Sequence, residues 1–107
     1  MADREKHTTL VFGDVRIDIK QMVSGSKIKD FAINVALIMD HELKDVFRVD
    51  TAQGYLHGQK FWISPDPEKL QDKRKKDYKG EIGSWKDNVV KNFKEYIRLY
   101  KKKFRAD

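Results

Sequence analysis

The chain has 107 residues, 39% of them hydrophobic, which suffices for one domain with a single core. Charged residues make up 37% of it and the formal net charge is +6, while the absence of cysteine excludes disulfides, thiol catalysis and thiolate metal sites. The charged N-terminus has no signal-peptide core, and no apolar run reaches the roughly 20 residues of a membrane span. We therefore expect a cytoplasmic protein without membrane contact, and the charge-rich composition is typical of thermophilic proteins.

Residues 8–22 alternate between apolar and polar side chains in two sets that are out of phase, with Gly13 and Asp14 at the change of phase. Such a change requires either an extra residue that bulges within one strand or a very tight turn between two strands. We predict one bulged strand, followed by a turn at residues 24–26.

Residues 28–39 carry the clearest strand pattern in the chain. The odd positions are apolar from Phe31 to Met39, and the even positions hold small or mostly apolar residues, namely Ala32, Asn34, Ala36 and Ile38. A strand that is apolar on both faces is usually central in a sheet. We expect the terminal helix to cover the odd face and a second copy of the protein, in a homodimer, to cover the even face. The alternative is that the N-terminal residues or the bulged first strand fold back over the even face.

Two further strands are predicted in residues 46–50 and 57–64, the first preceded by a polar connection in residues 40–45. Prolines end the last strand, because proline cannot donate a hydrogen bond to a neighbouring strand. Residues 65–83 follow as a charged and partly helical linker. Its first half has Leu70 as its only aliphatic residue, which cannot hold a helix against a core.

Residues 84–105 predict an amphipathic helix with Ser84 as its N-cap. Its apolar residues recur at spacings of three or four: Trp85, Val89, Phe93, Tyr96, Ile97, Tyr100 and Phe104. Residues 1–107 are thus predicted to form a single α+β domain. In it, an antiparallel four-stranded meander in residues 1–64 packs one face against the C-terminal helix.

The positive charge is confined to the C-terminal part of the chain. Residues 1–63 hold nine basic and nine acidic side chains, whereas residues 64–107 hold fourteen and eight. A positive surface attracts phosphate backbones or an acidic protein partner, and the alternative is a solvated helix face that only keeps the protein soluble. The residues predicted to contact nucleic acid are Lys60, Lys91, Lys94, Arg98, Lys101 and Lys102.

Asp50 and His57 bracket the loop between the last two predicted strands, so a hairpin would bring the carboxylate and the imidazole together. A histidine oriented by a carboxylate can act as a general base, and Arg48 can stabilise developing negative charge. These three residues are the candidate catalytic set for RNA cleavage without a metal, and no cofactor is predicted. The alternative is an aspartate that caps its own turn and a histidine at the edge of the core.

Residues 47–57 read FRVDTAQGYLH. This stretch resembles the pattern Arg-x-Asp-x-Ala-His-Gly-x-x-His of small uncharacterised prokaryotic proteins, which are loosely similar to TumE-like toxins of toxin–antitoxin systems. The matching residues are Arg48, Asp50, Ala52, Gly54 and His57, while Gln53 stands where such proteins often have His. The resemblance implies a toxin-like protein that binds or cleaves RNA and has an antitoxin as its partner. The alternative class is a non-enzymatic module that binds an acidic protein partner or itself.

Overall fold

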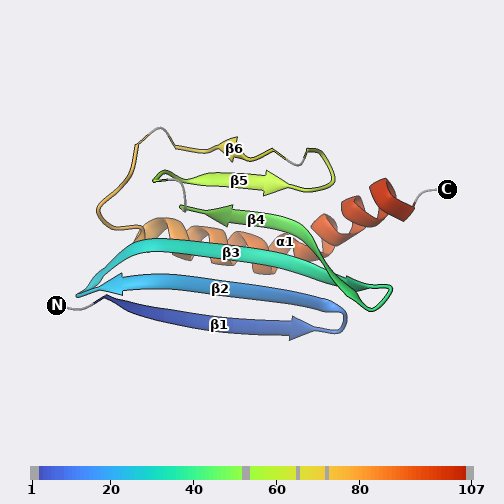
Figure 1. Cartoon of the computed structure of the whole chain (residues 1–107), viewed down its shortest axis with the longest axis horizontal. Coiled ribbons are helices and arrows are strands. Elements are labelled where there is room, and N and C mark those ends of the chain that lie inside the picture. The colour runs from blue at the N-terminus through green and yellow to red at the C-terminus, as the bar shows by residue number, and fades with distance from the viewer. Residues whose placement is uncertain (1–2, 52–53, 65, 72, 106–107) are drawn as a thin grey trace.

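The chain forms an α+β fold in which one antiparallel sheet lies in front of a single C-terminal helix (Figure 1). The computed structural model describes residues 3–51, 54–64, 66–71 and 73–105. The elements are β1 (Arg4–Phe12), β2 (Val15–Ser24), β3 (Lys27–Met39), β4 (Glu42–Asp50), β5 (His57–Lys60), β6 (Glu68–Lys69) and α1 (Lys79–Arg105). Each strand pairs with the next along the chain, so the meander order is confirmed, but the sheet has six strands rather than four. No helix among the described residues is both long enough and apolar enough to cross a membrane.

The prediction of one bulged strand in residues 8–22 is wrong, because β1 and β2 are separate strands joined by a tight turn. The turn contains Gly13 at a φ of 62°, a left-handed conformation that glycine adopts without the Cβ penalty of other residues. The two strands pair antiparallel, with Leu10 opposite Ile17 on the face toward the helix. The change of phase in the sequence is therefore a hairpin, in which each strand keeps its own alternation.

The prediction that residues 28–39 form a central strand is confirmed, since β3 lies between β2 and β4. The polar connection predicted in residues 40–45 is wrong, because β4 already begins at Glu42 after a turn with Asp40 and His41 at positive φ. A register shift beside Ala36 then lets β4 bury two successive side chains, Val46 and Phe47. The strand predicted in residues 57–64 ends at Lys60. Pro65, which was expected to end it, lies outside the described residues.

The predicted linker in residues 65–83 contains β6 and the first turn of α1, so the helix begins before Ser84. Asp77 fixes this start: its Oδ1 accepts hydrogen bonds from the backbone N–H groups of Ile28 and Lys79, each at 3.0 Å. The bond from Ile28 is the largest reason that the pKa of Asp77 lies below its usual value, and the bond from Lys79 adds to it against partial burial. The next residue, Tyr78, is fully buried and donates its backbone N–H to the Ile28 carbonyl at 2.9 Å. These hydrogen bonds hold the segment before the helix against the start of β3.

The apolar stripe of α1 packs against β3 and β4 as predicted, except that Phe104 near its end is 54% exposed. Val89, Phe93 and Ile97 are buried, and Tyr96 stacks on Phe47 with ring centroids 4.6 Å apart. Burial of an aliphatic or aromatic side chain of this size stabilises a fold by about 1.5–3 kcal/mol. Among the described residues, α1 lies on one face of the sheet and no helix lies on the other.

Candidate functional site

The face of the sheet away from α1, which we call the open face, carries polar side chains aligned across five strands. The strand register forms one row of residues across the sheet, in which each residue is paired with the next one on the neighbouring strand. From β1 to β5 the row consists of His7, Lys20, Ala32, Asp50 and His57. A parallel row beside it contains Thr9, Asp18, Asn34, Arg48 and Gln59. The three predicted catalytic residues therefore lie on the open face at the β4–β5 side.

The structure brings Asp50 and His57 together, as their positions around the loop predicted. His57 Nε2 lies 2.8 Å from Asp50 Oδ1, and the other oxygen of this carboxylate accepts a hydrogen bond from Arg48 Nε. The pair is buried, with 3% of Asp50 and 8% of His57 exposed, whereas 44% of the Arg48 side chain is exposed. The second ring nitrogen, Nδ1, lies 3.3 Å from the backbone oxygen of Tyr55. Both nitrogens of His57 thus face oxygen atoms of the chain itself, an arrangement that holds β4 and β5 together.

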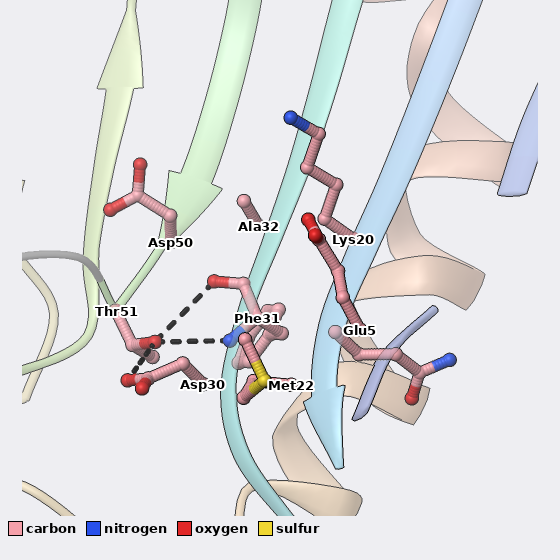
Figure 2. Close-up of a pocket in the computed structure, with 9 residues that line it drawn as sticks. Glu5, Lys20, Met22, Asp30, Phe31, Ala32, Asp50 and Thr51 are labelled. Atoms are coloured by element: carbon pink, nitrogen blue, oxygen red, sulfur yellow. Dashed lines mark hydrogen bonds between the residues drawn. The ribbon is translucent and has the colours of Figure 1, made fainter. Parts of the chain in front are cut away.

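Two shallow hollows lie on the open face beside this pair. The first has a volume of about 180 Å³ and contains Asp50 and Thr51 on one side and Lys20 and Glu5 on the other (Figure 2). The second, of about 230 Å³, lies along the neighbouring row and includes Arg16, Asp18, Asn34 and Arg48. Both share the small side chain of Ala32, which leaves room between the longer residues of β2 and β4.

Asp18 is the carboxylate that lines the second hollow. Burial raises its pKa, but hydrogen bonds from Thr9, Arg16 and His7 outweigh burial and hold the pKa below its usual value. The distances to its oxygens are 2.7 Å from Thr9 and 3.0 Å from His7. His7 is therefore part of a hydrogen-bonded cluster. The described residues contain no group of three or more His, Asp or Glu side chains that could hold a metal ion.

Thr51 connects the Asp50 loop to a segment far along the chain. Its buried hydroxyl accepts a hydrogen bond from the Phe31 backbone and donates one to Asp30 Oδ1, both at 3.0 Å (Figure 2). The same oxygen of Asp30 lies 2.9 Å from the guanidinium of Arg74. Arg74 also donates to the backbone oxygen of Lys29 at 2.8 Å. These contacts hold the segment before α1 beside the end of the sheet.

A third hollow, which we call the basic hollow, lies where that segment meets the β2–β3 turn. It has a volume of about 420 Å³ and is lined by Ser24, Lys27, Lys29, Arg74, Lys75 and Lys76. None of these residues was predicted as a site residue. The basic run in residues 73–76 is visible in the sequence, but nothing local indicates that Lys27 and Lys29 lie beside it.

The residues predicted to contact nucleic acid do not form one continuous set. Lys91, Lys94 and Lys102 are exposed on α1, and Lys101 is half-buried. Arg98 is held by Glu95 through two hydrogen bonds, of 2.9 and 2.6 Å, which raise the pKa of Arg98. Lys60 lies in β5, beside a hollow that also contains Asp66 and Glu68. Of the predicted residues, Lys91, Lys94 and Lys102 are thus the exposed lysines that share one helix, and Lys60 lies apart from them in β5.

Comparison with known proteins places the chain in one family. A family model described as a domain of unknown function, DUF7718, matches residues 1–106 and thus nearly the whole chain. No curated protein and no solved structure matches it. Two residues of the hairpin pattern, Ala52 and Gln53, lie outside the described residues, whereas Arg48, Asp50 and His57 are the residues that meet on the open face.

Proposed function

The chain belongs to the DUF7718 family, a domain of unknown function, and we propose that it binds RNA through the outer face of α1. The proposal depends on one observation. Lys91, Lys94 and Lys102 are exposed on this face, and no carboxylate of the described residues forms an ion pair with them. They span about 16 Å along the helix at a rise of about 1.5 Å per residue, a length that covers several backbone phosphates.

Ion pairs neutralise part of the positive charge outside the outer face of α1, although some lysines there, such as Lys27 and Lys76, form none within the described residues. Most arginines and several lysines outside the outer face of α1 have a carboxylate partner: Arg16, Lys29, Lys44, Arg48, Arg74 and Lys75. A paired cation adds little to the long-range potential, whereas unpaired lysines on one helix face add up. Lysine acts as a point charge on phosphate and reads no bases, so we expect RNA binding with little sequence preference.

Salt dependence tests the proposal. Fluorescence anisotropy with a labelled 20-nucleotide single-stranded RNA should show binding at low salt that weakens as salt rises. Release of counterions from three phosphates gives a slope of log affinity against log salt of about −2. Absence of binding at low salt would mean that the lysines are only a solvated surface, and binding insensitive to salt would contradict a phosphate contact. Binding of a purified acidic protein but not RNA would favour the antitoxin-like partner instead.

RNA cleavage is the second candidate function, and the specific observation in its favour is the 2.8 Å contact between Asp50 and His57. A carboxylate at this distance can orient an imidazole for acid–base chemistry. Reaction would require His57 to leave the Tyr55 oxygen and present Nδ1 to a substrate, since Nε2 faces Asp50. Toxin-like activity therefore depends on a rearrangement of the β4–β5 hairpin, whereas binding by α1 does not.

We also propose that the protein self-associates through the apolar end of the open face. Ile38 pairs with Leu43 across β3 and β4, and these side chains are 48% and 51% exposed. Ala36, also expected at the interface, is already buried within the single chain. At micromolar concentration, sedimentation should give twice the monomer mass of 12.6 kDa. Ile38→Lys should restore the monomer and Ile63→Lys, at a more exposed residue elsewhere, should not; a wild-type mass of 12.6 kDa would rule out the dimer.

A further inference from the structure

We propose that the basic hollow is a binding site for a terminal phosphate group, a phosphomonoester carried by the end of an RNA chain or by a free nucleotide. The RNA-end form of this inference rests on the proposed function, and the nucleotide form does not. Five of the six lining residues have cationic side chains, and the sixth, Ser24, uses its hydroxyl to hydrogen-bond Asp3. Ammonium and guanidinium groups are charged hydrogen-bond donors, which is the chemistry that a phosphate dianion requires.

The hollow is assembled by contacts between segments that are far apart in the sequence. Asp77 accepts from the backbone N–H of Ile28, which is 49 residues away, and Tyr78 donates to the carbonyl of the same residue. Tyr78 also accepts a hydrogen bond from the backbone N–H of Lys75 on its hydroxyl at 3.0 Å. The basic run before α1 is therefore held in a defined conformation opposite Lys27 and Lys29, at the end of the sheet where the β2–β3 turn lies (Figure 1).

Three of the five cations are fixed by carboxylates that lie outside the lining. Lys29 pairs with Asp3 at 3.3 Å, Arg74 pairs with Asp30 at 2.9 Å, and Lys75 pairs with Glu81. Hydrogen bonds from Ser24 and then from Lys29 are the main reasons that the pKa of Asp3 lies below its usual value. These pairs reduce the freedom of long side chains that binding would otherwise have to immobilise. They leave each cation with further N–H donors for a ligand.

Lys27 and Lys76 are different, because within the described part of the chain they form no ion pair. Lys27 contributes through its charge to the low pKa of Asp77 but forms no ion pair with it, so the ammonium groups of Lys27 and Lys76 keep their N–H donors for a ligand in the hollow. A phosphomonoester carries between one and two negative charges at neutral pH, whereas each backbone phosphodiester carries one. Convergence of cations from two segments on one hollow favours the more highly charged group. A volume of about 420 Å³ also lies in the range of small-molecule pockets, so the hollow has room for the attached sugar.

The test compares RNA ends on the full-length chain. Fluorescence anisotropy is measured with one 12-nucleotide RNA, internally labelled, in three forms: with a 5′ phosphate, with a 3′ phosphate, and with hydroxyls at both ends. At least one phosphorylated form should bind about tenfold more tightly than the hydroxyl form. The double variant Lys27→Gln with Lys76→Gln should remove this preference. The matched control, Lys91→Gln with Lys94→Gln on α1, should weaken all three RNAs and keep the preference.

Free ligands separate this inference from the proposed function. Calorimetry with AMP, and with inorganic phosphate, should detect binding to the wild type that is lost in the Lys27→Gln, Lys76→Gln variant. If AMP binds in this way while no RNA binds, the hollow is a nucleotide site and the proposal of RNA binding fails. The inference is overturned if all three RNAs bind equally and AMP does not bind, or if polyglutamate displaces the ligand as well as AMP does.

Discussion

Charge reversal of Lys91, Lys94 and Lys102 to glutamate is expected to abolish RNA binding at physiological salt. The three side chains are exposed on one face of α1 and form no ion pair with a carboxylate of the described residues. Reversal replaces three attractions to phosphate by three repulsions. It removes the release of about three counterions, so any residual binding should have a salt slope smaller in magnitude by about 2. Anisotropy titrations at several salt concentrations measure both quantities.

The control must match the change in net charge, because a chain with a net charge of +6 attracts RNA from any direction. Reversal of Arg4, Lys6 and Lys69, all exposed on β1 and β6, lowers the net charge by the same amount. This variant should lose only the part of the affinity that arises from overall charge. Circular dichroism should show unchanged helix content in both variants. Equal losses of affinity would mean that α1 is not the contact surface.

The parts of the fold that the sequence predicts correctly are those where local pattern and packing agree. β3 is apolar on both faces and is central, and the stripe of α1 from Val89 to Tyr100 packs on the sheet. The wrong prediction concerned residues 8–22, where the alternation of apolar and polar side chains changes phase at Gly13. A bulge within one strand and a hairpin turn between two strands both produce such a change. Only the pairing of β1 with β2 along its full length distinguishes them, and pairing is a property of residues apart in the chain.

The start of α1 was misplaced for a similar reason. Gly80 and Gly83 disfavour a helix, so the local pattern suggested a beginning at Ser84. The interactions that extend the helix to Lys79 come from elsewhere: Asp77 and Tyr78 bond to Ile28 at the start of β3. Tertiary contacts of this kind override the low helix propensity of glycine.

In the candidate site, too, contacts within one hairpin were predictable from the sequence and contacts between distant segments were not. A hairpin loop brings Asp50 to His57, and the sequence spacing predicts this juxtaposition because the two residues flank one turn. Their burial could not be predicted, since it depends on neighbours from other strands. The basic hollow could not be predicted either, because Lys27 and Lys76 meet only through the contacts of Ile28 with residues 77 and 78.

Asp50→Ala is expected to destabilise the protein by about 3 kcal/mol. The change removes the carboxylate that faces His57 and Arg48, and the ring of His57 then keeps a buried nitrogen without that partner. Loss of one member of a buried ion pair costs about 3–5 kcal/mol, and the lower end applies here because Arg48 is partly exposed to solvent. Thermal unfolding should show a fall in Tm of more than about 10 °C for a domain of this size.

Two variants control for shape and for position. Asp50→Asn keeps an oxygen for His57 and should lower the free energy of unfolding much less than Asp50→Ala. Asp45→Ala removes an exposed carboxylate from the same strand and should lower the free energy of unfolding by about 1 kcal/mol or less. A structural role for the pair predicts that stability falls in Asp50→Ala while RNA binding by α1 is retained at temperatures below the transition. If Asp50→Ala and His57→Gln instead leave Tm unchanged and remove an RNA-cleaving activity of the wild type, the pair is catalytic. The β4–β5 hairpin would then have to open during reaction, because His57 Nδ1 lies against the Tyr55 oxygen in the closed arrangement.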